Sequence, residues 1–228
     1  MYLKDFFREY LQKNPRLQVW EACTHYFIWQ KCIKKNLKPI DLKIPWINLG
    51  ATNFLKQRLD KKSVVLEFGM GGSTLFFASR CQNLVSIEHD KCWFHKVQKR
   101  MNNAKQKIKP FLCAIPRHRL IRKQKAKSAL NNKKDFSTHN YAEIAKRFKD
   151  KSFDCILIDG IDREACLMAC HSKIKIGGYL VLDDAERSEY STSNAKKTLR
   201  HFEAVFDAWG PCPSLRHFTR CKIYVRKK

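Results

Sequence analysis

The chain is short of glycine and of acidic side chains. Its 228 residues hold 8 Gly and 21 Asp or Glu against 46 Lys or Arg, a formal net charge of +25. No apolar run reaches the roughly 18 residues that indicate a membrane-spanning helix, and the N-terminus lacks the apolar core and cleavage site of a signal peptide. With 44% hydrophobic residues, the composition predicts one cytoplasmic domain with a strongly basic surface.

Cys-x-x-Cys pairs are absent, although the chain has 10 cysteines. Cys155 falls in an expected buried strand, and Cys166 and Cys170 are one turn apart in a helix expected to cover a sheet. This placement favours small buried thiols in a reducing cytosol over a disulfide framework. A metal or redox site that combines Cys166, Cys170 and His171 is the alternative.

Three of the few glycines are concentrated in one turn, at Gly69, Gly71 and Gly72. The turn follows Val64 to Phe68, a short β-branched run typical of a buried parallel strand, and Ser73 or Thr74 can cap the helix that follows it. Glycines let the backbone turn tightly and approach a ligand closely. The pattern of strand, glycine turn and helix predicts a nucleotide-cofactor site.

The acidic residues around this turn distinguish two cofactors. Glu88 ends a second short strand, 21 positions after Glu67, where an acidic side chain can hold a ribose diol. A dinucleotide site needs a third glycine where this chain has Thr74, and Glu67 beside two phosphates is unfavourable. Beside the ammonium and sulfonium groups of S-adenosylmethionine, the same carboxylate is attractive.

Glu67 and the glycine turn resemble the first motif of the class I S-adenosylmethionine-dependent methyltransferases. The run from Ile87 to Trp93 resembles a small bacterial-type subgroup of that family. The family's later strands match residues 111–115, 153–160, 176–184, 204–209 and 217–226, with a helix at 194–202. The resemblance implies an α/β fold: a Rossmann-like, doubly wound, mostly parallel seven-stranded sheet with an antiparallel last strand, plus N-terminal helices.

Residues 1–60 are expected to form an N-terminal helical cap, ahead of an S-adenosylmethionine-binding domain at 61–228. Helical spacing covers residues 5–13 and 16–34, with Pro15 and Pro39 as breaks. The cap can cover the substrate opening, or it can lie on a membrane with Trp20, Phe27, Trp29 and Ile33 facing the lipid. Packing of these side chains on the domain itself is the third interpretation.

The positive charge is concentrated at residues 91–151, which hold 19 Lys or Arg and 3 acidic residues, a net charge of 19 − 3 = +16. Residues 116–140 are interpreted as a basic insertion. Such a segment attracts nucleic acid or an anionic membrane surface, and a solvated lysine-rich loop is an equal alternative. No RNA-binding motif accompanies it.

The resemblance also assigns site residues. We assign cofactor binding to Glu67, Gly69, Gly71, Gly72, Ser73, Thr74, Glu88, His89 and Asp159. Asp159 and Asp184 are the candidate catalytic residues. In catechol-type members, carboxylates after the fourth and fifth strands bind magnesium. Because this chain has an Asp183-Asp184 pair instead of Asp-Asn, magnesium is possible but is not favoured, and no metal ligand is assigned.

The sequence therefore predicts an S-adenosylmethionine-dependent methyltransferase. The favoured acceptor is a hydroxyl oxygen of a small molecule or a glycan, because the Pro-Pro-Tyr signature of amino-methyltransferases is absent. One alternative is an RNA methyltransferase that uses the basic insertion to hold its substrate. Another is a non-catalytic module that binds anionic surfaces.

Overall fold

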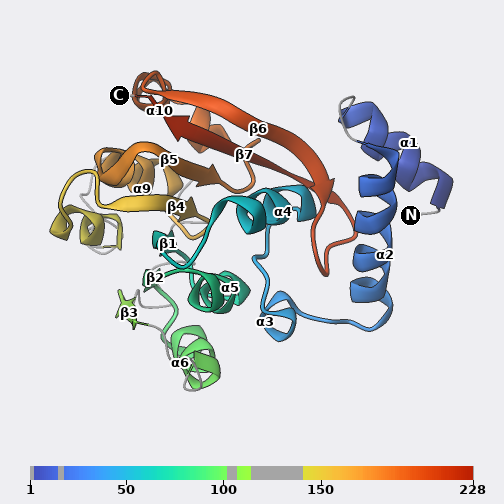
Figure 1. Cartoon of the computed structure of the whole chain (residues 1–228), viewed down its shortest axis with the longest axis horizontal. Helices are drawn as coiled ribbons and strands as arrows, with labels where there is room; N and C mark the ends of the chain where they lie inside the picture. The colour runs from blue at the N-terminus through green and yellow to red at the C-terminus, as the bar shows by residue number, and fades with distance from the viewer. Residues whose placement is uncertain (1–2, 15–17, 102–106, 114–140, 228) are drawn as a thin grey trace, which may run out of the picture.

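A single seven-stranded sheet organises the molecule (Figure 1), and the computed structural model describes residues 3–14, 18–101, 107–113 and 141–227. The strand order is β3-β2-β1-β4-β5-β7-β6. The strands are β1 (Val64–Phe68), β2 (Asn83–Glu88), β3 (Lys107–Leu112), β4 (Phe153–Ile158), β5 (Ile174–Leu182), β6 (Phe202–Pro211) and β7 (Phe218–Arg226). β1 to β5 pair in parallel and β7 is antiparallel to both of its neighbours, which confirms the predicted doubly wound sheet.

Helices cover both faces of the sheet. α4 (Leu49–Arg58) and α5 (Gly72–Arg80) pack on one face, and α9 (Arg163–Cys170) and α10 (Ser193–Leu199) pack on the other. α6 (Lys91–Met101) lies beside α5 through Phe94 and Val97. Short 3-10 helices are η1 (Ile144–Arg147), η2 (His171–Lys173) and η3 (Ser188–Ser191). Because central strands lie between two helical layers, they read as continuous apolar runs in the sequence.

The N-terminal helices α1 (Leu3–Lys13), α2 (Val19–Lys34) and α3 (Pro39–Leu42) lie to one side of the sheet (Figure 1). α1 and α2 form an aromatic cluster with Phe218 of β7. Trp29 Nε1 donates to the Leu215 carbonyl at 2.6 Å, which fixes α2 to the β6–β7 hairpin. The domain boundary at residue 60 stays a prediction, and α4, which precedes it, packs into the core with Val65 and Phe77.

The four residues expected to face a membrane do not lie together on one exposed face of α2. Trp29 is 5% exposed and packs on the domain, and Ile33 packs beside it. Trp20 and Phe27 lie on the solvent side of α2. Within the part of the chain described here, no helix is both long and apolar enough to cross a membrane.

The third strand is displaced from its predicted position at 111–115. β3 spans Lys107–Leu112 and pairs with β2 at the edge of the sheet. Residues 108–112 of this edge strand are half-buried or exposed, so polar residues are mixed with apolar ones, and the strand tolerates Pro110 because it has a free edge. The apolar-run criterion therefore missed its first half. The basic insertion at 116–140 lies outside the described residues.

The remaining expected elements are found with small shifts. β5 carries an irregularity at Gly177, where φ is +79°, so the expected glycine turn lies within the strand's extent. All ten cysteines are free, and Cys155, Cys166 and Cys170 are buried in apolar clusters. Burial raises the pKa of these thiols, which agrees with a packing role.

Asn48 provides a test of how α4 is attached to the sheet. Its Oδ1 caps α4 by accepting from Ala51 N at 2.8 Å, and its Nδ2 donates to the carbonyls of Ala208 and Thr219 at 2.9 and 3.3 Å. Since all three bonds are lost in Asn48→Ala, we expect a loss of about 2–4 kcal/mol in the free energy of unfolding. Urea denaturation measures it. Asn53→Ala in the same helix is the control, with a change of about 0.5 kcal/mol or less; equal effects would contradict the capping role.

Candidate functional site

Four parallel strands end side by side and bring the candidate residues together. The register aligns Phe68 with Ile87 and Ile158, and Ile158 with Leu182. Gly69, Glu88, Asp159 and Asp183 therefore follow one another along the carboxyl-end edge of the sheet. Ligands of open α/β sheets bind at this edge. The sequence-predicted site residues thus converge on one place.

Glu67 is a carboxyl group inside the protein. It is fully buried in β1, and its Oε1 accepts from the Thr74 and Ser86 hydroxyls at 2.5 and 2.6 Å. Its Oε2 has no hydrogen-bond partner. Burial raises the pKa of Glu67 to about 7, against the hydroxyls of Ser73, Ser86 and Thr74, which lower it. A buried acceptor without a donor is costly, so this atom is suited to a donor supplied by a ligand.

The three glycines of the turn differ in their backbone conformation and in what a Cβ atom would contact. Gly69 has φ of +97°, and a Cβ there would lie 3.1 Å from Gly160 N. A Cβ on Gly71 would meet nothing within 4 Å, whereas one on Gly72 would meet Ile44 O at 2.0 Å and Pro39 O at 2.5 Å. Gly71 therefore borders open space, and Gly72 allows the segment around α3 to pack on the turn.

The start of α5 differs from the predicted cap. Gly71 is the N-cap residue, and neither Ser73 nor Thr74 occupies that position. Thr74 Oγ1 instead accepts from Gly71 N at 2.9 Å while it donates to Glu67. The Thr74 hydroxyl thus connects the buried carboxylate to the turn that lies above it.

Glu88 and Trp93 bind the main chain of Met70, Glu88 at its amide and Trp93 at its carbonyl. Glu88 Oε2 accepts from Met70 N at 2.9 Å, and Trp93 Nε1 donates to Met70 O at 2.6 Å. Glu88 Oε1 accepts from the amides of His89 and Asp90 at 2.7 and 2.8 Å. The residues of the Ile87 to Trp93 run therefore fix the glycine turn, in addition to any contact that Glu88 makes with a ribose.

His89 lies next to this clamp. Its Nδ1 is 2.9 Å from Glu88 Oε1, and its ring meets Tyr141 edge-on at 5.8 Å. Tyr141 is fully buried, and a Cβ on Gly160 would lie 2.0 Å from its hydroxyl. The Tyr141 hydroxyl donates to the Ile87 carbonyl at 3.4 Å. Tyr141 therefore fills the space behind the ends of β2 and β4.

Arg163 joins the acidic residues at the ends of β4 and β5. The side chain is buried, and its Nη2 lies 3.3 Å from Asp159 Oδ1 and 3.4 Å from Asp184 Oδ2. Its Nη1 lies 3.7 Å from Asp183 Oδ2 and also donates to the Asp183 carbonyl. Its Nε donates to Gly160 O at 3.1 Å. One guanidinium is thus shared by three carboxyl groups.

The pKa values of Asp159 and Asp183 are both raised. Burial raises the pKa of Asp159 to about 6, and Arg163 opposes the shift. Burial and the neighbouring Asp159 and Asp184 raise the pKa of Asp183 well above its usual value. Asp184 accepts from Arg187 Nε and Nη2 at 3.0 and 2.8 Å and so belongs to two arginines. Asp159 is the carboxyl group best suited to exchange a proton near neutral pH.

These residues do not fit a magnesium site as they stand. The guanidinium of Arg163 lies between the three carboxyl groups that would supply the oxygen ligands, so the positive charge they need is already provided. Among the described residues, no group of three or more His, Cys, Asp or Glu side chains is arranged to hold a metal ion.

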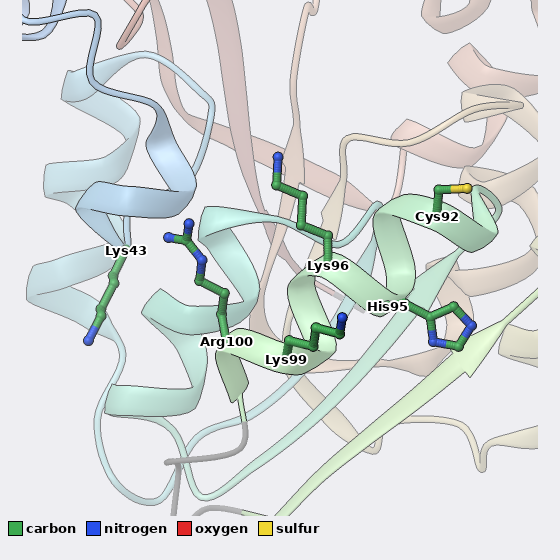
Figure 2. A pocket seen from close by; sticks show the side chains of 6 residues that line it. All are labelled: Lys43, Cys92, His95, Lys96, Lys99 and Arg100. Carbon is green, nitrogen blue, oxygen red and sulfur yellow. The ribbon is translucent and has the colours of Figure 1, made fainter.

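A basic hollow lies on the helix that follows β2. Figure 2 shows its lining: Lys43, Cys92, His95, Lys96, Lys99 and Arg100. Arg100 pairs with Asp41 at 2.5 Å, while Lys96 extends over the ring of Trp93 at 5.2 Å. Because Trp93 also contacts the glycine turn, this basic hollow is one side chain away from the candidate cofactor site.

The comparisons with known proteins identify the fold. No family model and no curated protein matches the sequence. An rRNA methylase from Streptococcus thermophilus is 13% identical, with a TM-score of 0.52 over 84% of this chain and 98% of that chain. A proposed methyltransferase from Streptococcus mutans, in complex with SAH, is 14% identical, with a TM-score of 0.51 over 83% and 98%. The chain has the fold of the class I S-adenosylmethionine-dependent methyltransferases.

Sequence reasoning assigns no role to three residues of this site, Arg163, Trp93 and Tyr141. Only Trp93 belongs to a motif, the run from Ile87 to Trp93. A signal existed for Arg163, since an arginine four residues after Asp159 lies on the first turn of a helix and can reach back to the strand end. Nothing local in the sequence shows that Trp93 would reach Met70.

Gly71 and Gly72 form a matched pair for a test of the turn. Gly71→Ala adds a methyl group to open space, so we expect stability within about 0.5 kcal/mol of wild type and at least about tenfold weaker binding of S-adenosylhomocysteine. Gly72→Ala drives a methyl group into the backbone of Ile44 and Pro39, so we expect a loss of about 2–4 kcal/mol in stability. Thermal unfolding and calorimetry measure both. Equal melting temperatures for the two variants would contradict this assignment.

Proposed function

We propose that this protein is a methyltransferase that uses S-adenosylmethionine. The observation that carries the proposal is Glu67: a fully buried carboxyl group whose Oε2 has no donor, below a turn whose Gly71 faces open space. A cationic ligand with N–H donors satisfies such a group. The ammonium group of S-adenosylmethionine has this chemistry, so the residues present fit the cofactor.

The residues assigned to the cofactor divide by role. We propose that Glu67 attracts the methionine end, that Gly69 and Gly71 keep the backbone close to the ligand, and that Glu88 and His89 border the ribose. Thr74 holds Glu67 in place through its hydroxyl, and Ser73 lies beside it at the start of α5. When bound, S-adenosylmethionine supplies an electrophilic methyl group. The protein then has to align an acceptor and remove its proton.

For the acceptor we propose a hydroxyl oxygen of a small molecule or a glycan. Asp159 is the preferred general base, since the carboxyl group borders the turn and its pKa is raised to about 6. Arg163 orients Asp159 and stabilises its charged form. Asp184, the second catalytic candidate, is held by Arg163 and Arg187, which suits it to orient an acceptor.

Calorimetry with S-adenosylhomocysteine tests the cofactor, and a screen of acceptors with labelled methyl donor tests the activity. We expect binding in the micromolar range and transfer to a hydroxyl-bearing acceptor. A folded protein that binds no S-adenosylhomocysteine would favour the non-catalytic binding module. Binding without transfer to any hydroxyl acceptor would remove the O-methylation proposal and keep the cofactor site.

The pKa of Glu67 predicts a pH dependence of cofactor binding. Because the pKa of the free protein's Glu67 is about 7, the carboxyl group is neutral at lower pH and cannot attract an ammonium group. We expect affinity for S-adenosylhomocysteine to be close to its maximum at pH 8, to be about half of that maximum at pH 7, and to be about tenfold below it at pH 6. Calorimetry across pH 5.5–8 measures it, and Glu67→Gln should give weaker, pH-independent binding.

The raised pKa of Glu67 also predicts how the stability of the ligand-free protein depends on pH. Its pKa is raised from a usual value of 4.5 to about 7, so its contribution to stability is full below the unfolded-state pKa and is lost as pH rises through 7. Melting temperature should therefore fall from pH 4.5 to 7 in wild type and fall less in Glu67→Gln. Identical profiles would show that Glu67 titrates normally.

RNA is the second candidate acceptor, and the basic hollow favours it. Lys96→Ser with Lys99→Ser removes two exposed cations beside Trp93. If the hollow contacts phosphates, we expect weaker RNA binding and a logarithmic salt slope smaller by about 1.4–1.8, with unchanged S-adenosylhomocysteine affinity. The matched control is Lys196→Ser with Lys197→Ser on α10. An equal effect of both pairs would indicate general charge attraction and would leave the hydroxyl proposal without a competitor.

A further inference from the structure

Helix α2 has two faces with different roles. One face is buried against α1 and the β6–β7 hairpin through Ala22, Tyr26 and Trp29. The opposite face carries Trp20 at 65% and Phe27 at 67% exposure, flanked on its two sides by Val19 at 62% and Ile28 at 41%. At about 3.6 residues per turn, Trp20 and Phe27 are two turns apart on the same line, and Lys31 continues that line.

The exposed face is also basic. Lys31, Lys34 and Lys35 follow the apolar residues along the helix and are exposed. Glu21 is the only acidic residue of α2, and it lies at the edge of this face, where its Oε2 accepts from Gln18 N at 3.4 Å. We call the seven residues Val19, Trp20, Phe27, Ile28, Lys31, Lys34 and Lys35 the outer face of α2.

We infer that the outer face of α2 binds the surface of an anionic lipid bilayer. Trp and Phe favour the boundary between headgroups and acyl chains, and lysines beside them attract anionic headgroups. The chain's net charge of +25 adds a long-range attraction to such a surface. The apolar half and the basic half of one helix face together match both layers of the interface.

A second copy of this chain fits the outer face poorly. In a symmetric contact the three lysines of each α2 would approach the same cations of the partner, or an apolar patch with no counter-charge. A protein partner would need an apolar centre flanked by acidic residues. The bilayer supplies both features without a specific shape, so the composition of the face favours it.

The position of α2 makes lipid binding relevant to the site. Trp29 and the Ser214 hydroxyl, which donates to the Leu37 carbonyl, tie the α2–α3 segment to the β6–β7 hairpin. That hairpin follows the carboxyl end of β6, which runs parallel to β5, so it lies at the same edge of the sheet as the glycine turn. Bilayer binding would therefore hold the candidate site close to a lipid surface.

Vesicle co-sedimentation with the full chain tests the inference. We expect binding to vesicles of phosphatidylcholine with 30% phosphatidylglycerol, about the surface charge of a natural anionic leaflet, and little binding to phosphatidylcholine alone. Trp20→Ser with Phe27→Ser should weaken binding by at least about tenfold. The matched control is Ile176→Ser with Val205→Ser, which removes two exposed apolar residues of β5 and β6.

Three further outcomes decide the matter. Lys31→Gln with Lys34→Gln and Lys35→Gln should reduce the preference for anionic lipid. Equal vesicle binding by the α2 pair and the control pair would overturn the inference. A second result would also overturn it: the wild-type protein does not bind vesicles, and analytical ultracentrifugation shows dimers that are lost in the Trp20→Ser with Phe27→Ser variant. An unchanged melting temperature of the α2 pair shows that the variant is folded, and this control does not depend on cofactor binding, which keeps the test separate from the proposed function.

Discussion

One buried guanidinium determines the geometry of the carboxyl-end edge of the sheet. Arg163 contacts the carboxyl groups of Asp159, Asp183 and Asp184 and the main chain of both strand ends. Without it, three acidic side chains from adjacent strands would repel one another in a poorly solvated place. Arg163 therefore joins the ends of β4 and β5 next to the glycine turn and reduces the repulsion among these carboxyl groups.

That interaction leaves Glu67 as the site's uncompensated acid. Arg163 balances the strand ends of β4 and β5, but the described residues place no cation on Glu67, whose Oε2 lacks any donor. Burial keeps this group neutral at low pH and makes it available for a cationic ligand at higher pH. Two acidic regions thus lie side by side: Arg163 supplies a cation to one, and the described residues supply none to the other.

The sequence was informative where a feature depends on neighbours in the chain. β1, the glycine turn and β2 could be predicted because a β-branched run, glycines and a strand-end Glu88 are local signals. β3 is displaced from its predicted position because an edge strand has a mixed pattern. The close packing of Gly72 on Pro39 and Ile44, about thirty residues earlier in the chain, could not be predicted. Contacts of this kind depend on the tertiary structure and have no local signature.

The contact of Pro39 and Ile44 with Gly72 fixes the N-terminal helices to the glycine turn. The segment around α3 is packed on Gly72 so closely that no side chain fits between them, and α2 is hydrogen-bonded to the β6–β7 hairpin. Two attachments at opposite ends of the segment restrain its rotation as well as its position. The outer face of α2 therefore has a fixed direction relative to the glycine turn. A surface bound by α2 would therefore be presented to the candidate site in one orientation.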